Sequence, residues 1–267
     1  MDYRLIFVEG LPGTGKTTFS EYIYKLLIEQ RVQAELLLEG DEKIPCNFCY
    51  ITGIPKNKNI NMPIEKYLIA ETENYFFANI KNYNDVEIKT QLRQYDIGDE
   101  FNKYVSLQEY VHCTLEWWRH WFDKNIGDTV LVFDSAFMQC PINEMIFRGA
   151  SDIEVVGYIN SIIEIIKPHN PVCIYLRRES AEIAINFAKA VKDEAWAKGV
   201  DGLAAMGCSD LFERRFILEN ILLSEVANIV CTINDYDWSD AEAKVKRMVQ
   251  AKLRTDGLLY ASIRVLW

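Results

Sequence analysis

The chain carries little positive charge and no long apolar run. Its 267 residues include 29 lysines and arginines against 39 aspartates and glutamates, a formal net charge of −10 at pH 7. This balance argues against a nucleic-acid partner, because such binding needs basic residues that neutralise successive phosphates. No apolar run approaches the ~20 residues of a membrane-spanning helix, and an apolar strand begins almost at Met1. We therefore expect no membrane span and no signal peptide, and a cytoplasmic location.

Histidine is scarce, and the cysteines form no recognisable framework. There are three histidines and seven cysteines, and this odd number suits reduced thiols better than a set of disulfides. Cys46 and Cys49 form a lone C-x-x-C motif, and no histidine stands at a zinc-finger spacing from it. We interpret both as small apolar residues of a loop, with a zinc or redox site as the alternative.

The remaining composition is that of an ordinary globular protein. Hydrophobic residues make up 49% of the chain and charged residues 25%, which excludes a disordered chain. We find no internal repeat. The length suits one large α/β domain with an inserted lid, so we expect a single domain over residues 1–267.

The most informative segment is a glycine-rich loop. Residues 10–18 fit the phosphate-binding pattern G-x-x-x-x-G-K-[ST], with an apolar strand pattern before them and a helical pattern after them. Glycines let backbone N–H groups surround phosphates, and the helix N-terminus favours negative charge. Lys16 is then expected at the β- and γ-phosphates, and the Thr17 hydroxyl at Mg²⁺. The predicted nucleotide-binding residues of this loop are Gly10, Leu11, Pro12, Gly13, Thr14, Gly15, Lys16, Thr17 and Thr18.

Five short apolar runs alternate with helical patterns along the chain. They cover residues 5–8, 34–39, 129–133, 172–176 and 229–233. This alternation predicts a parallel sheet with helices on both faces and ligands at the carboxyl ends of the strands. Pro- and Asn-rich residues predict a loop over 46–62 and a polar break over 82–98. The apolar tail, 258–267, is a candidate sixth strand or a surface buried in a homodimer.

Carboxylates follow two of the predicted strands. Asp134 ends the third run, where a carboxylate can help to organise Mg²⁺. Ser135 rather than glutamate comes next, which disfavours a hydrolytic motor and favours transfer to an acceptor that brings its own nucleophile. Glu39 and Asp41 follow the second run and are candidates for the base that takes the acceptor's proton. A solvated acidic loop is the alternative for these two residues.

Cations occur where a closing lid would deliver them to the moving phosphoryl group. Lys189 and Lys192 precede a glycine-containing break between two helical patterns, and they are our candidates for lid residues. We place the lid at about 186–210. Trp117 and Trp121, four residues apart on a helical pattern, are candidates for a wall that stacks on a ring, whereas Trp118 has the spacing of a core residue.

The chain resembles the thymidylate kinase and deoxynucleoside kinase group of P-loop kinases. Residues 7–18, FVEGLPGTGKTT, look like the group's F-x-E-G-x-x-G-x-G-K-[ST]-T opening, and residues 39–43 are similar to its base-bearing acidic loop. Residues 170–176 look like its fourth strand, and residues 233–235 resemble its adenine-side loop.

This resemblance implies a three-layer P-loop NTPase fold with a five-stranded parallel sheet of order 2-3-1-4-5 and a helical lid. It also implies a helical acceptor-binding insertion at about 45–125, and ATP and Mg²⁺ as the bound groups. Asn234 and Asp235 would then lie beside the adenine.

Two departures from the group bear on the acceptor. Ser135 replaces an arginine that usually follows the third strand, and the R-x-R lid pattern is absent. We therefore expect an ATP-dependent small-molecule kinase that phosphorylates a hydroxyl of a nucleoside-like, sugar-like or antibiotic acceptor. The alternatives are a nucleotide-dependent regulatory ATPase or switch that acts on a protein partner, and a nucleoside monophosphate kinase.

Overall fold

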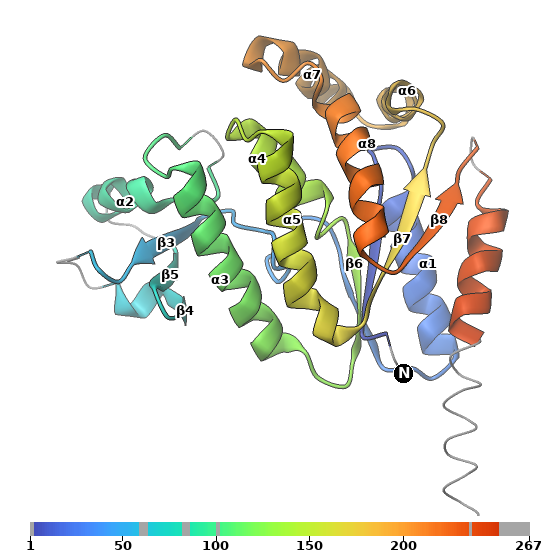
Figure 1. Ribbon diagram of the computed structural model, residues 1–267, viewed down its shortest axis with the longest axis horizontal. Helices are drawn as coiled ribbons and strands as arrows, with labels where there is room; N and C mark the ends of the chain where they lie inside the picture. Colours follow the sequence, from blue (N-terminus) through green and yellow to red (C-terminus); the bar gives the residue numbers. More distant parts are fainter. Residues whose placement is uncertain (1–2, 59–63, 82–85, 100–101, 235–236, 251–267) are drawn as a thin grey trace, which may run out of the picture.

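A five-stranded parallel sheet forms the centre of the molecule (Figure 1). The computed structural model describes residues 3–58, 64–81, 86–99, 102–234 and 237–250. The strands of this sheet, in spatial order, are β2 (Ala34–Leu37), β6 (Val130–Asp134), β1 (Leu5–Glu9), β7 (Pro171–Arg177) and β8 (Asn228–Thr232). Every pairing within it is parallel, so the alternation of apolar runs and helical patterns predicted this sheet correctly.

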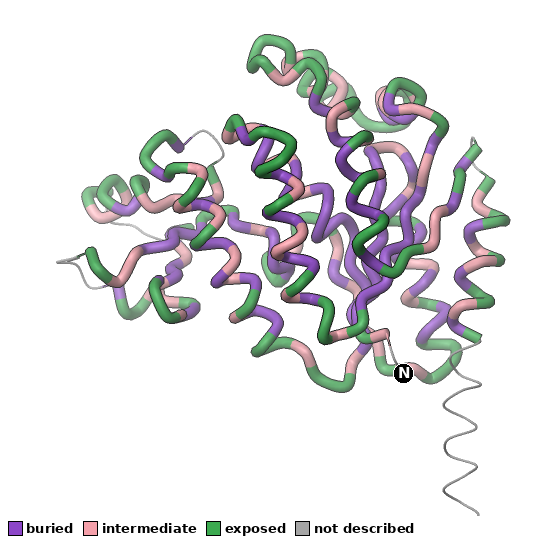
Figure 2. Tube along the Cα trace, viewed as in Figure 1, coloured by how far each residue is buried: buried purple, intermediate pink, exposed green. Residues whose placement is uncertain are grey.

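Helices cover both faces of the sheet. Successive residues of β1 point to opposite faces, so each face has an apolar core of its own. Leu5 and Phe7 belong to one core, and Ile6 and Val8 belong to another. The helices of the first core are α3 (Leu107–Asn125), α4 (Gln139–Phe147), α5 (Asp152–Ile166) and α8 (Leu211–Leu222). The second core joins the sheet to α1 (Lys16–Glu29) and to a helix at 239–250. Figure 2 shows the central strands buried between these two layers.

A second sheet lies between β2 and β6 in the chain. Its three strands are antiparallel in the order β3-β5-β4, with β3 at Ile51–Pro55, β4 at Leu68–Glu71 and β5 at Tyr75–Asn79. The prediction of a loop over 46–62 is therefore wrong, and the helical insertion predicted at about 45–125 contains these three strands as well as helices. Tertiary burial decides the outcome, because Ile51 and Phe77 pack into the main core and compensate for Pro55. The predicted break at 82–98 is also wrong, since it contains α2 (Val86–Leu92).

The observed strand order, β2-β6-β1-β7-β8, differs from the predicted order 2-3-1-4-5. The three antiparallel strands, which were not predicted, carry the numbers β3, β4 and β5. Within the parallel sheet itself, the third strand along the chain, β6, lies between the second and the first. Short 3₁₀ helices complete the secondary structure at Glu65–Tyr67, Arg93–Tyr95, Lys167–His169, Leu203–Met206 and Leu223–Glu225.

The segment predicted as a lid is mostly helical, with an unexpected break at 192–193 and the predicted glycine-containing break reduced to 207–210. Helix α6 covers Ala181–Val191 and α7 covers Glu194–Gly202. The break falls at Lys192 because the Asp193 side chain accepts the Trp196 N–H at 2.8 Å and starts a new helix. Gly199, expected in the break, lies inside α7, where an exposed glycine costs about 1 kcal/mol.

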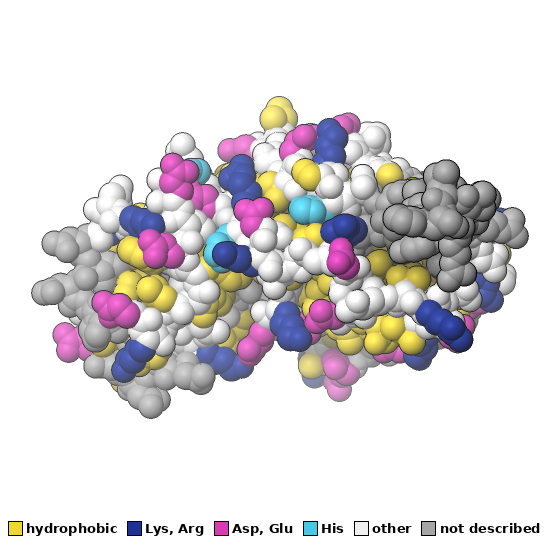
Figure 3. Space-filling view, turned by 90° about the horizontal axis from the view of Figure 1, so that it is seen from below, with side chains coloured by type: hydrophobic (Ala, Val, Ile, Leu, Met, Phe, Trp, Pro, Cys, Tyr) yellow, Lys and Arg dark blue, Asp and Glu magenta, His cyan; other side chains and the backbone are white. Residues whose placement is uncertain are grey.

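The surface agrees with the charge balance of the sequence. On the face seen from below the view of Figure 1, acidic and basic side chains are interspersed (Figure 3).

Among the described residues, no helix is both long enough and apolar enough to cross a membrane. The tail at 258–267, our candidate sixth strand, lies outside the described residues.

Candidate functional site

The glycine-rich loop, residues 10–15, joins β1 to α1 at the carboxyl end of the central strand. Gly10, Gly13 and Gly15 all have positive φ, at 141°, 78° and 85°. A Cβ added to Gly10 would lie 2.3 Å from the Leu176 carbonyl oxygen, and one on Gly15 would lie 2.7 Å from the Trp238 indole. Both positions therefore require glycine. The loop ends at the N-terminus of α1, which gives a backbone cradle suited to phosphate.

Lys16 is the first residue of α1 and is buried. Its Nζ donates to the Leu11 carbonyl oxygen at 3.1 Å, so the ammonium lies over the loop. Burial, and then the neighbouring Arg215 guanidinium, hold the pKa of Lys16 below its usual range. An incoming phosphate would replace the missing solvation of this ammonium, so Lys16 fits its predicted role.

Thr17 and Asp134, the two residues predicted to hold Mg²⁺, are in direct contact. The Thr17 Oγ1 donates to Asp134 Oδ2 at 2.6 Å, and Ser135 Oγ donates to Asp134 Oδ1 at 2.9 Å. Strands β1 and β6 are neighbours in parallel register, which brings Asp134 beside the start of α1. A hydroxyl and a carboxylate oxygen are the ligand types that Mg²⁺ prefers, so these two residues fit that ion.

Glu39 and Asp41 occupy different environments. Glu39 faces the glycine-rich loop and accepts a hydrogen bond from Gln139 Nε2 at 2.5 Å. Asp41 Oδ1 instead accepts the Lys43 backbone N–H at 2.9 Å, which closes a local turn. Of the two residues predicted as base candidates, Glu39 lines the cavity beside the glycine-rich loop and Asp41 does not.

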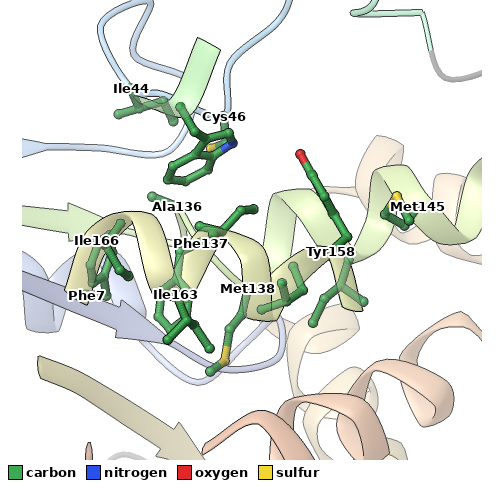
Figure 4. Packing of buried hydrophobic residues seen from close by; sticks show 14 of the residues in the cluster. Phe7, Ile44, Cys46, Ala136, Phe137, Met138, Met145, Tyr158, Ile163 and Ile166 are labelled. Carbon is green, nitrogen blue, oxygen red and sulfur yellow. The ribbon is translucent and has the colours of Figure 1, made fainter. Parts of the chain in front are cut away.

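The two tryptophans predicted to stack on a ligand have another role. Trp117 Nε1 donates to the Pro45 carbonyl at 3.0 Å, and Trp121 Nε1 donates to the Lys43 carbonyl at 2.8 Å. They anchor the segment that follows Glu39. Figure 4 shows Ile44 and Cys46 of this segment in the hydrophobic core with Phe137. Trp118 is fully buried, which confirms its predicted core position.

The two lysines predicted as lid residues also lie in different environments. Lys192 lines the same cavity as the glycine-rich loop, with its Nζ 5.1 Å from the centroid of the Trp196 ring, whereas Lys189 forms an ion pair with Asp201 at 2.5 Å on the surface. Of the two residues predicted to lie beside the adenine, Asn234 is exposed and its carbonyl accepts the Asp237 N–H at 2.9 Å. Asp235 lies outside the described residues. Trp238, which packs on Gly15, is the side chain of this region that borders the loop.

Arg215 reaches the site from α8 and connects its parts. Its Nη2 donates to the Gly10 carbonyl at 3.0 Å and to Gln139 Oε1 at 3.3 Å, and its Nε pairs with Glu219 at 2.8 Å. Tyr175 completes the network by donating to Glu219 Oε2 at 2.7 Å. Gln139 and Glu219 were not among the predicted site residues, although the four-residue spacing of Arg215 and Glu219 on a helical pattern is a signal for this pair.

Glu9, at the end of β1, is fully buried behind the loop. Its carboxylate accepts the backbone N–H groups of Phe137, Met138 and Gln139 at 2.9 to 3.2 Å. A side chain of β1 thus caps the N-terminus of α4. Burial, and then the nearby Glu219 charge, raise the pKa of Glu9 to about 7. This glutamate positions the start of the helix that carries Gln139.

These groups surround one cavity of about 520 Å³. Its lining comes from the glycine-rich loop, Glu39, Trp238 and the helices α4, α6, α7 and α8. None of the described residues between 45 and 125 lines it, although this was the segment expected to bind the acceptor. That segment lines a separate cavity of about 800 Å³ around Tyr75 and His112.

The site offers few protein ligands for a metal. Among the described residues, no group of three or more His, Cys, Asp or Glu side chains is placed to hold an ion. Thr17 and Asp134 would therefore share Mg²⁺ with the phosphates of a nucleotide, as Mg²⁺ commonly binds. No protein-family model matches this chain, and a search of curated proteins finds no match. The fold and the site residues define an α/β protein with a candidate phosphate-binding loop.

Proposed function

We propose that this protein is a P-loop kinase of the three-layer fold type, which transfers the γ-phosphoryl group of ATP to a hydroxyl of a small molecule. The observation that carries the proposal is the 2.6 Å contact of Thr17 with Asp134 beside a glycine loop that has no room for a Cβ at Gly10 or Gly15. Lys16 and Thr17 follow this loop directly and line one cavity with it, which supports the binding of phosphate and Mg²⁺ next to each other.

The chain's own residues would act mainly by positioning and by charge stabilisation. Backbone N–H groups of the loop and Lys16 hold the β- and γ-phosphates, while Thr17 and Asp134 hold Mg²⁺. When bound, Mg²⁺ neutralises charge on the phosphate oxygens. Lys192, at the junction of α6 and α7, closes over the phosphates and excludes water.

Glu39 would handle the acceptor's proton. Gln139 holds one oxygen of this carboxylate at 2.5 Å, which leaves the other oxygen for the acceptor hydroxyl. The hydroxyl oxygen forms the new bond to the γ-phosphorus as the bond to the β-phosphate oxygen breaks. The hydroxyl proton passes to Glu39 and then to solvent, and the products are ADP and the phosphorylated acceptor.

Ser135 favours this transfer over hydrolysis. A motor-type ATPase needs a side chain that activates water after the strand carboxylate, and here the Ser135 hydroxyl donates to Asp134 instead. The nucleophile must therefore come from the acceptor.

Mass spectrometry tests the proposal directly. Purified protein is incubated with ATP, Mg²⁺ and a pooled library of nucleosides, nucleotides, sugars and antibiotics, in parallel with Lys16→Ala. We expect one compound class to gain a single phosphoryl group with the intact protein only. Consumption of ATP without any phosphorylated compound would favour a switch that acts on a protein partner, and equal activity of Lys16→Ala would overturn the assignment.

A further inference from the structure

Two cysteines that are far apart in the chain lie together in the fold. Cys46 belongs to the segment that follows Glu39, and Cys140 lies in the first turn of α4, directly after Gln139. Cys46 is buried in the core with Phe137, and Cys140 packs against the same core (Figure 4). The Cys46 thiol forms a hydrogen bond with the Cys140 thiol, and this contact, followed by burial, raises the pKa of Cys46 well above its usual range.

Other contacts hold each of the two segments in place. Trp117 Nε1 donates to the carbonyl of Pro45, the residue before Cys46, at 3.0 Å. On the other side, Cys140 Sγ donates to the Ser135 carbonyl oxygen at 3.2 Å. The two thiols are therefore neighbours because separate elements of the fold pack together.

This pairing is not the one that the C-x-x-C motif suggests. Cys49, the other cysteine of the motif, is exposed, whereas Cys46 is 7% exposed and belongs to the core. All seven cysteines of the chain are free thiols. The thiol that contacts Cys46 belongs to α4, so a disulfide of Cys46 would join two elements rather than close a short loop.

The two thiols differ in their access to solvent. Cys140 is half-buried, so a small reagent can reach its sulfur, whereas Cys46 is shielded. Oxidation of cysteine follows this access, and a sulfenic acid condenses readily with a neighbouring thiol. Cys140 is thus placed to react first and Cys46 to resolve the product.

We propose that Cys46 and Cys140 form a reversible intramolecular disulfide when the protein meets hydrogen peroxide. In the first step the Cys140 sulfur takes one oxygen of the peroxide as the O–O bond breaks, which gives a sulfenic acid and water. In the second step the Cys46 sulfur bonds to the Cys140 sulfur as the S–O bond breaks, and the departing hydroxide leaves as water with the Cys46 proton. Two thiols are oxidised by two electrons and one peroxide is reduced to two waters. A dithiol reductant reverses the change by thiol–disulfide exchange.

The disulfide would act on the contact between Glu39 and Gln139. Its two sulfur atoms lie about 2.05 Å apart, which is closer than hydrogen-bonded thiols, so one of the two segments must move as it forms. Gln139 directly precedes Cys140, and its Nε2 donates to Glu39 at 2.5 Å. Cys140 also loses the proton that it donates to the Ser135 carbonyl oxygen. Oxidation should therefore displace Glu39 and slow the proposed phosphoryl transfer, and only this consequence rests on the proposed kinase function.

Thiol mapping tests the disulfide. The reduced full-length protein is treated with a small molar excess of hydrogen peroxide, its free thiols are alkylated, and its unreduced peptides are analysed by mass spectrometry. We expect the loss of two hydrogen atoms per chain and a cross-linked pair of peptides that contain Cys46 and Cys140, both reversed by dithiothreitol. A link between Cys46 and Cys49, disulfides between chains only, or sulfinic acid at Cys140 without a disulfide would overturn the proposal.

Three variants sharpen this test. Cys140→Ser keeps a hydroxyl that can donate to the Ser135 carbonyl, and Cys46→Ala keeps a small apolar side chain in the core, so both should fold and neither should give the cross-link. Cys49→Ser is the matched control, because Cys49 is exposed and three residues from Cys46, and it should cross-link as the wild type does. Loss of the cross-link in Cys49→Ser would contradict the pairing.

The effect on Glu39 is measured in the kinase assay. Peroxide should lower kcat at least tenfold in the wild type and in Cys49→Ser, but less than twofold in Cys140→Ser, and dithiothreitol should restore it. An unchanged kcat in the cross-linked protein would overturn the effect on Glu39. Absence of any product from the reduced protein would overturn the kinase proposal and leave the disulfide to be judged by thiol mapping alone.

Discussion

The Thr17 hydroxyl and the Asp134 carboxylate lie 2.6 Å apart although 117 positions separate them in the chain. Two neighbouring parallel strands make this possible, since both residues follow carboxyl ends at the same edge of the sheet. Their pairing places side by side two oxygen atoms of the kind that Mg²⁺ prefers.

Replacement of Asp134 by Asn should therefore weaken use of Mg²⁺. We expect kcat to fall at least 100-fold, with the Mg²⁺ concentration for half-maximal activity raised, because a neutral amide attracts the ion less. Thr17→Ser retains the hydroxyl and serves as the control, with activity within about fivefold of the wild type. Steady-state kinetics over a Mg²⁺ series make the measurement, and an unchanged Mg²⁺ dependence in Asp134→Asn would remove this residue from the metal site.

Lys189 and Lys192 should differ sharply despite their similar sequence context. Lys192→Ala should lower kcat/KM for ATP at least tenfold, because this side chain lines the cavity that the glycine-rich loop also lines. Lys189→Ala should leave it nearly unchanged, since a surface ion pair such as Lys189–Asp201 contributes about 0–1 kcal/mol. Parallel initial-rate measurements compare the two variants, and equal losses would argue that α6 as a whole, not Lys192, approaches the nucleotide.

Glu219 should be essential for stability. Glu219→Gln leaves the buried Arg215 charge without its carboxylate, and we expect a loss of about 3–5 kcal/mol in the free energy of unfolding. Tyr175→Phe removes one hydrogen bond to Glu219 and should cost about 1–2 kcal/mol. Urea denaturation gives both values, and a loss under 1 kcal/mol in Glu219→Gln would show that the pair is dispensable.

Glu9 gives the stability a pH dependence of known sign. Its pKa is raised from 4.5 to about 7 in the folded state, so the folded protein binds the proton more tightly than the unfolded chain does. The contribution of Glu9 is therefore fully present below pH 4.5 and is lost as pH rises to about 7. The free energy of unfolding should fall, relative to Glu9→Gln, by up to about 3 kcal/mol between these two pH values. A constant difference between the two proteins across that range would contradict the assignment.

The part of the site that could be predicted from sequence is the part set by local geometry. Residues 10–18 specify their own strand–loop–helix context, and Asp134 follows from the rule that parallel strands end at one edge. Gln139, and the contact of Arg215 with the Gly10 carbonyl, could not be predicted in this way. Their positions depend on how α4 and α8 pack on the sheet, and no local pattern encodes that packing.

The same distinction explains the errors in the fold. The strands of the second sheet are four or five residues long and include Pro55 and Gly53, so their propensity is weak. Their antiparallel partners and the core beneath them decide the structure. Gly53 is required there, since a Cβ would lie 2.1 Å from the Cys113 sulfur of α3.

Gly13 meets α6 as closely as Gly15 meets Trp238. A Cβ on Gly13 would lie 2.8 Å from the Cβ of Ala188 and 2.9 Å from its Cα, so the loop and α6 are in direct backbone contact. A nucleotide that reshapes the loop should then shift α6, which carries Phe187 and Val191 into the same cavity. If the proposed kinase function holds, binding of ATP should change the affinity for the acceptor, and the acceptor should change the affinity for ATP by the same factor.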